Sequence, residues 1–270
     1  MAKKKILFVM QEIMPYVKEN YMSRIGRKLP QGIQEKGKEV RVFMPRYGLI
    51  KERRHQLHEV IRLSGINIIV DDNDHSLVIK VASIPSARMQ IYFIDNEEYF
   101  HRKAKLFDEN GALFEDTDER IIFFSRGVLE TIKKLRWFPD LVHVQGWLGS
   151  LIPLYVKKAY QEDPLFRHTK VVYMLYSGDK FEGTLNKKFK NKAKFDEIKD
   201  KDLELVKEPS YINLNKLAIH YSDGVIVASQ DVDKELIDFA REEGKQVLDY
   251  VPEEKIVEEY SLFYDKLLVS

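Results

Sequence analysis

Residues 6–10 read Ile-Leu-Phe-Val-Met, and residues 40–44 read Val-Arg-Val-Phe-Met. A short unbroken apolar run is typical of a strand that is covered on both faces, as in a parallel sheet. Between the two runs, apolar residues recur about once per turn over 23–36, which predicts a helix despite Pro30. Gly37 stands where the C-terminal cap of this helix is expected. Strand, helix and strand in this order predict a right-handed βαβ unit.

The alternation of strands and helices continues along most of the chain. Further helices are predicted over 118–137, 147–160, 211–221 and 231–243. Further strands are predicted over 141–144, 171–175 and 224–228. This rhythm predicts an α/β fold with a Rossmann-like, doubly wound parallel sheet. Ligands bind such sheets at the carboxyl ends of the strands. The loops of interest are therefore 11–22, 145–150, 176–183 and 229–231.

Two segments interrupt this rhythm. Residues 66–95 contain three β-rich runs separated by turn-forming residues, which predicts a β-hairpin insert beside the parallel sheet. Residues 184–208 are dense in charge and begin with closely spaced lysines that have no acidic residue among them. Charged runs usually face water, so we expect a solvated loop or a mobile helix there, with contact to a polyanion as the alternative.

The composition limits the kind of protein. Lys and Arg number 44 and Asp and Glu number 43, so the net charge of +1 gives no electrostatic reason to expect nucleic acid as a partner. The absence of cysteine excludes thiolate metal sites and a cysteine nucleophile, and the seven histidines show no metal-ligand spacing. No apolar run has the length of about 20 residues that a membrane span needs, and residues 6–10 are too short for a signal-peptide core. We expect a soluble, cytoplasmic protein with no metal or other cofactor.

Many collinear segments carry a family resemblance. The first is Ile6-Leu-Phe-Val-Met-Gln-Glu-Ile-Met-Pro-Tyr-Val-Lys18. Others are Met44-Pro-Arg-Tyr-Gly48, Tyr92-Phe-Ile-Asp-Asn96, Phe123-Phe-Ser-Arg126, Pro139-Asp-Leu-Val-His143 and residues 219–229. Together they resemble the bacterial glycogen synthases and plant starch synthases, which transfer glucose from ADP-glucose to an α-1,4-glucan. The resemblance implies the N-terminal half of a GT-B glycosyltransferase, with a nucleotide sugar or an α-glucan as the expected ligand.

The first candidate site is the loop after the first strand. The resemblance implies a Lys-x-Gly-Gly-Leu motif that binds the donor diphosphate, and this chain has Lys18, Glu19, Asn20, Tyr21 and Met22 there. The lysine is retained, whereas Asn20 and Tyr21 replace both glycines. Glycine lets backbone N–H groups approach a phosphate closely because it has no Cβ. Glu19 also adds a negative charge where an anion would bind.

Two other loops depart from the family pattern. Where the family has His-Asp-Trp-His, this chain has Gln145-Gly-Trp-Leu148. Trp147 is retained, and it either stacks on a sugar or packs inside the protein. Leu148 replaces an imidazole and cannot donate a hydrogen bond or stabilise developing charge. At the third loop, Tyr176 and Ser177 replace a His-Asn pair.

Chain length is the largest difference from the family. The enzymes that the chain resembles have two domains with the active site between them, and the second domain carries most of the donor-binding groups. Too few residues follow Ser229 to build such a domain. Residues 252–268 resemble the C-terminal helix that returns to pack on the first domain. We therefore expect residues 1–270 to be one domain and a finished natural chain, with the second domain deleted internally.

These departures lead to two main hypotheses. The first is a catalytically defective glycogen or starch synthase homologue, with no catalytic residue assigned, that acts as a binding or regulatory module of α-glucan metabolism. The second is half of a retaining hexosyltransferase, completed by a separate donor-binding domain or by homo-oligomerisation. It requires an exposed apolar face where the partner would dock. A small-ligand binder that uses the remodelled cleft is a third alternative.

Overall fold

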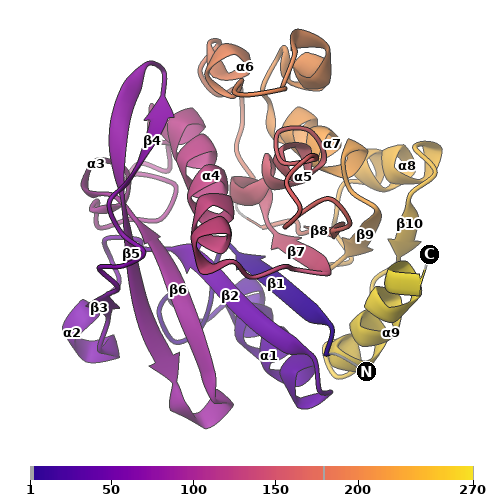
Figure 1. The fold of residues 1–270 in the computed structure, drawn as a ribbon. Helices are drawn as coiled ribbons and strands as arrows, with labels where there is room; N and C mark the ends of the chain where they lie inside the picture. Colours follow the sequence, from indigo (N-terminus) through magenta and orange to yellow (C-terminus); the bar gives the residue numbers. More distant parts are fainter. Residues whose placement is uncertain (1–2, 179, 270) are drawn as a thin grey trace.

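The computed structural model describes residues 3–178 and 180–269. Within these residues, ten strands form one sheet in the order β10-β9-β8-β7-β1-β2-β6-β5-β3, and β4 pairs with β5 off this path (Figure 1). The strands are β1 (Lys5–Met10), β2 (Glu39–Pro45), β3 (His58–Glu59), β4 (Ile66–Val70), β5 (Asn73–Ile84), β6 (Met89–Asp95), β7 (Leu141–Gln145), β8 (Lys170–Leu175), β9 (Gly224–Val227) and β10 (Gln246–Leu248).

The sheet is doubly wound about β1. The chain adds β2 and then β6 on one side of β1, and later adds β7, β8, β9 and β10 on the other, all in parallel register. The winding direction therefore reverses between β1 and β7, which pair so that Met10 lies opposite Gln145. Such a reversal leaves a crevice at the carboxyl ends of the two strands.

Helices cover both faces of this sheet. The face seen in Figure 1 carries α4 (Thr117–Leu135), α5 (Ile152–Lys157), α7 (Tyr211–His220) and α8 (Lys234–Glu242). The opposite face carries α1 (Tyr21–Glu35) and α9 (Ile256–Val269). The short helices are α2 (Glu52–His55), α3 (Glu97–Phe100), α6 (Phe189–Lys192), η1 (Pro85–Ala87), η2 (Trp147–Gly149) and η3 (Asp200–Val206). No helix among the described residues is both long and apolar enough to cross a bilayer.

Helix α9 packs beside α1 on the same face of the sheet. Gly32 of α1 allows a close approach, since a Cβ there would lie 2.5 Å from the Val257 side chain. The Tyr264 hydroxyl lies 2.9 Å from Nδ1 of His143 in β7, and both side chains are buried. Burial lowers the pKa of His143 to about 3, because the charged imidazolium would lose its hydration. His143 is therefore neutral inside the sheet.

The structure corrects two expectations and refines a third. Residues 66–95 are not wholly an insert beside the sheet, because β6 pairs in parallel with β2 and belongs to the core. The hairpin is β4–β5, and its turn residues Asp71 and Asp72 both have positive φ. The helix expected over 147–160 is broken into η2 and the shorter α5. The charged segment 184–208, expected to be a solvated loop or a mobile helix, contains the short helices α6 and η3, and it buries Phe189.

Candidate functional site

The crevice at the carboxyl ends of β1 and β7 brings the predicted loops together. Gln145, the last residue of β7, is buried and reaches the loop that follows β1. Its Nε2 donates to the Met22 carbonyl at 3.0 Å, and its Oε1 accepts from the Glu12 backbone N–H at 3.4 Å. Loop 11–22 and loop 145–150 are therefore joined by the side chain of Gln145, one of the predicted site residues.

Asn20 caps the helix that would otherwise present its N–H groups to an anion. The Asn20 side chain accepts a hydrogen bond from the Ser23 backbone N–H at 2.8 Å, and the Ser23 hydroxyl accepts from the Asn20 backbone N–H at 3.0 Å. This reciprocal capping box satisfies donors at the N-terminus of α1. A helix N-terminus is a common anion site because its N–H groups lack partners, and here two of these donors have partners within the chain.

Glu12 is a buried carboxylate that the sequence interpretation missed as a site residue. Its side chain is fully buried, accepts a hydrogen bond from Asn20 Nδ2 at 2.6 Å, and forms an ion pair with Lys105. Its position directly after the first buried strand, next to the reversal of winding, is the signal that identifies it. No comparable signal marks Lys105, which comes from a loop 93 positions away.

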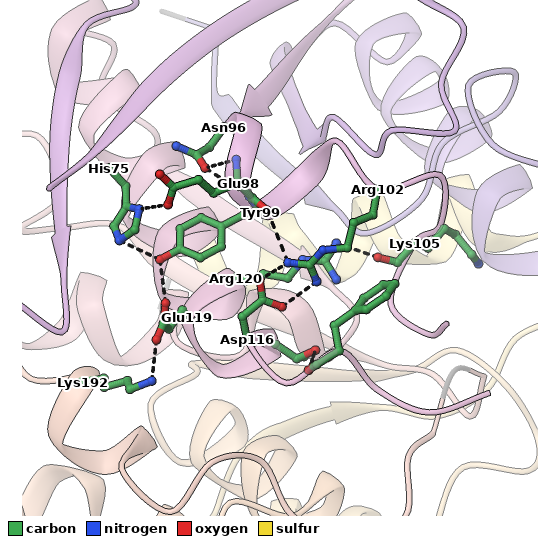
Figure 2. Close-up of polar contacts among 12 residues, drawn as sticks. His75, Asn96, Glu98, Tyr99, Arg102, Lys105, Asp116, Glu119, Arg120 and Lys192 are labelled. Atoms are coloured by element: carbon green, nitrogen blue, oxygen red, sulfur yellow. Dashed lines mark hydrogen bonds and ion pairs between the residues drawn. The ribbon is translucent and has the colours of Figure 1, made fainter. Parts of the chain in front are cut away.

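The segment between α3 and α4 supports this lysine. Figure 2 shows Arg120 of α4 reaching the backbone oxygen of Lys105, and the two atoms are 2.6 Å apart. Arg120 is buried beside the rings of Phe100 and Phe114, and burial lowers its pKa to about 10. The same figure shows Arg102 paired with Asp116, which fastens the two ends of the segment. Lys105 is therefore positioned by a charged framework.

A second group of buried polar contacts lies beside this framework. The Tyr99 hydroxyl lies 2.9 Å from His75 Nε2 and 2.9 Å from Glu119 Oε2 (Figure 2). Lys192 of α6 binds Glu119 at 2.5 Å and Asp118 at 2.9 Å, so the charged segment 184–208 is tied to the start of α4. These contacts join segments far apart in sequence and satisfy charges at the end of the sheet.

Tyr21 and Tyr176 meet across the mouth of the crevice. Their rings are stacked, with centroids 6.0 Å apart and an interplanar angle of 10°. Burial, together with the nearby Tyr250 and Glu253, raises the pKa of Tyr21 to about 12, so its hydroxyl stays neutral. The Tyr211 hydroxyl donates to the Tyr176 carbonyl at 2.9 Å and steadies the third loop. Two of the predicted site residues, from different loops, are therefore in contact with each other.

Trp147 and Leu148 are both buried. The Trp147 indole packs edge-on against Phe181, with ring centroids 5.0 Å apart, and only 2% of the residue is exposed. This placement agrees with packing inside the protein, one of the two interpretations of the retained tryptophan. Leu148 is fully buried, and its backbone N–H donates to Gln11 Oε1 at 3.2 Å. Gly146 has φ +81°, and a Cβ there would lie 2.5 Å from the same Gln11 oxygen.

The rim of the crevice is polar. Ser177 Oγ donates to Asp231 Oδ1 at 2.6 Å, and this hydrogen bond lowers the pKa of the Asp231 carboxyl. Lys18 and Glu19 are exposed, and Glu19 lies 3.7 Å from Arg24. Lys18 is linked to the capping box through its backbone, because the Ser23 hydroxyl donates to the Lys18 carbonyl at 3.2 Å.

Known proteins give a consistent match to this architecture. The profile of the starch synthase catalytic domain matches residues 5–249. Glycogen synthase of Chlorobaculum tepidum is 35% identical over 235 residues, which cover 87% of this chain and 47% of the relative. Glycogen synthase of Pelodictyon phaeoclathratiforme is 37% identical over 174 residues, which cover 64% of this chain and 36% of the relative.

The chain belongs to the glycogen and starch synthase family.

The predicted fold is also confirmed. The catalytic domain of starch synthase IV from Arabidopsis thaliana, solved with ADP and acarbose, superposes with a TM-score of 0.73. The match covers 93% of this chain and 52% of that chain at 15% identity, so it supports a shared GT-B fold. This chain spans about half the length of the curated glycogen synthases that it matches. The matched residues 5–249 include all four predicted loops.

Proposed function

We propose that this member of the glycogen and starch synthase family does not transfer glucose by itself and acts as a binding or regulatory module of α-glucan metabolism. The observation that carries the proposal is the stacking of Tyr21 on Tyr176. These side chains stand at a glycine and a histidine of the family motifs, and they contact each other across the crevice. A diphosphate approaching the start of α1 would have to displace this pair.

Two further features support the proposal. Asn20 already satisfies donors at the N-terminus of α1, so an incoming phosphate would compete with the capping box. The Leu148 side chain is buried and has no polar atom, whereas the resemblance implies an imidazole at this position. Transition-state stabilisation of glucosyl transfer needs donors aimed at developing charge, and these loops do not supply the family's set.

The half-enzyme hypothesis has weaker support. It requires an exposed apolar face beside the crevice. The exposed large apolar side chains of the described residues are Ile61, Ile69, Phe138, Leu262 and Val269, and none belongs to the four loops. A polar rim with Lys18, Glu19 and Ser177 is more compatible with a small polar ligand or a glucan than with a docked domain.

The decisive test is glucose transfer from ADP-glucose to glycogen by the purified chain, with calorimetry of ADP-glucose and co-sedimentation with glycogen run in parallel. We expect no turnover, with binding to one of the two ligands. Turnover by the chain alone would refute the proposal, and turnover only after addition of a donor-binding domain would establish the half-enzyme instead.

A variant with the family residues restored tests whether the replaced side chains prevent nucleotide binding. Asn20→Gly, Tyr21→Gly and Tyr176→His together restore the family residues around the start of α1. We expect the affinity for ADP to rise at least tenfold, because the donors of α1 become available to phosphate. Tyr221→Phe at the C-terminal end of α7 is a matched aromatic control away from the crevice, and it should leave the affinity unchanged. An unchanged affinity in the reverted variant would show that the replaced side chains do not close the site.

A further inference from the structure

A second pocket lies at the opposite, amino end of the parallel sheet. It encloses about 580 Å³ between the C-terminal end of α1, the start of β2 and the turn before β6. Its charged lining residues are Lys3, Lys38, Glu39, Arg41 and Arg88. Its neutral polar lining residues are Gln34, Gln90 and Tyr92. Four cations therefore face one carboxylate in a chain whose overall charge is nearly balanced.

The single carboxylate is already bound. Glu39 Oε1 accepts a hydrogen bond from Trp137 Nε1 at 2.5 Å. Of the four cations, Lys38 is 2.9 Å from Asp265 of α9 and so is partly neutralised. Within the described residues, Lys3 and Arg88 are exposed and form no ion pair. The pocket thus keeps an excess of positive charge that the protein itself does not compensate.

Arg41 is held in a fixed position inside the pocket. One of its terminal nitrogens donates to the Tyr92 hydroxyl at 2.5 Å. Its Cζ lies 5.6 Å from the centroid of the Tyr92 ring and 5.3 Å from that of Trp137, so the guanidinium contacts two aromatic rings. Its Nε is buried without a hydrogen-bond partner in the protein. An oriented guanidinium binds an oxyanion at a lower entropic cost than a free side chain.

We propose that this pocket binds a small molecule that carries a phosphoryl group. Guanidinium and ammonium groups on several sides match the oxygens of a phosphate, which accepts charge-assisted hydrogen bonds from both. The volume exceeds that of one phosphate, and Gln34, Gln90 and Tyr92 provide hydrogen-bonding groups for an attached polar part. The site is separate from the crevice, which lies at the other end of the strands.

The two tryptophans of the chain make a direct test available. Trp137 donates to Glu39 at the pocket, whereas Trp147 is buried in the crevice. The test is an NMR titration with pyrophosphate at constant ionic strength. We expect the indole N–H resonance of Trp137 to shift saturably and that of Trp147 to stay in place. Each signal is assigned with a Trp→Phe variant. A ligand that enters the crevice would instead move the Trp147 signal, so this test is independent of the proposed function.

Three variants distinguish specific pyrophosphate binding in the pocket from nonspecific attraction to positive charge. Arg88→Gln removes an exposed charge, so the fold should persist while pyrophosphate affinity falls about fivefold. Lys187→Gln is the control, because it removes the same charge from an exposed position of the charged segment. Arg41→Lys keeps the charge but loses the planar fork, and it should weaken binding roughly tenfold with an unchanged circular dichroism spectrum. The absence of a saturable Trp137 shift, or an equal loss in Arg88→Gln and Lys187→Gln, would overturn the proposal.

Discussion

The two ends of the parallel sheet differ in how their polar groups are satisfied. At the carboxyl end, Asn20, Gln145 and Ser177 each bind groups of their own chain, and Glu12 lies against Lys105. At the amino end, Arg88 is exposed and the Arg41 Nε has no partner in the protein. The carboxyl end, where the resemblance implies a ligand site, is internally satisfied, whereas the amino end keeps cationic groups without a partner in the protein.

This difference has an energetic meaning. A buried polar group that has its partners gains little from a ligand, because the ligand must first replace existing hydrogen bonds. A cation near solvent that lacks a protein partner exchanges only its hydration for the anion, and no contact within the protein has to break. Ligand binding at the carboxyl end therefore requires rearrangement of the loops, whereas binding at the amino end does not.

The largest expected effect is the pH dependence of stability that the buried His143 of β7 causes. His143 has a pKa of about 3 in the folded chain against about 6.5 when unfolded. Between these values the unfolded state takes up a proton and the folded state does not, so stability falls as pH decreases from 6.5 toward 3. We expect this one group to remove on the order of 4 kcal/mol over that range. Urea unfolding at pH 7, 5 and 4 measures it.

His143→Gln provides the control for this pH dependence. Its stability should fall less steeply than that of the parent below pH 6.5, because the titrating group is gone while the carboxylates are unchanged. Equal slopes in the two proteins would mean that the imidazole is hydrated or protonated in the folded state.

The second-largest effect compares the loss of stability after one substitution at each end of the sheet. Lys105→Met leaves the fully buried Glu12 without its cation, and we expect a loss of about 3 kcal/mol in the free energy of unfolding. Arg88→Gln at the amino end should change it by less than about 0.5 kcal/mol. Chemical denaturation of both variants tests the comparison, and similar losses at the two positions would contradict it.

Much of the fold follows from local sequence patterns. The apolar runs at 6–10 and 40–44 and the helix between them correspond to β1, β2 and α1, because buried parallel strands have a distinctive composition. The start of α1 at Tyr21, capped by Asn20, lies two residues before the start predicted for this helix. The membership of β6 in the core could not be inferred, since a hairpin pattern does not reveal which strand lies beyond it.

The location of the candidate site could be predicted from the sequence, but most of the side-chain contacts within it could not. The loops at 11–22, 145–150 and 176–183 follow strands whose carboxyl ends share one edge, so their convergence is a consequence of topology. The partners within it depend on side-chain geometry across long sequence separations. The ion pair of Glu12 with Lys105 and the stacking of Tyr21 on Tyr176 have no local signature.

The third effect compares two glycines. A Cβ on Gly26 of α1 would lie 2.0 Å from the Glu12 carbonyl oxygen, so Gly26→Ala should cost about 2 kcal/mol despite the higher helix propensity of alanine. Gly37 at the amino end has φ +88° and no atom near its Cβ position, so Gly37→Ala should cost about 1 kcal/mol from backbone strain alone. Thermal and urea unfolding rank the two. A reversed order would mean that loop 11–22 yields easily and that the carboxyl end is not closely packed.

The smallest effect addresses the contact on which the proposed function depends. In a double-mutant cycle, Tyr21→Ala and Tyr176→Ala should couple by about 1 kcal/mol, the value expected of stacked rings beyond their separate burial. Tyr21→Ala with Tyr92→Ala is the matched cycle, since Tyr92 lines the pocket at the other end of the sheet, and the two losses should add. If the first cycle is also additive, the tyrosines do not hold each other across the crevice. A ligand could then part them at no cost, and the carboxyl end would be as open to binding as the amino end.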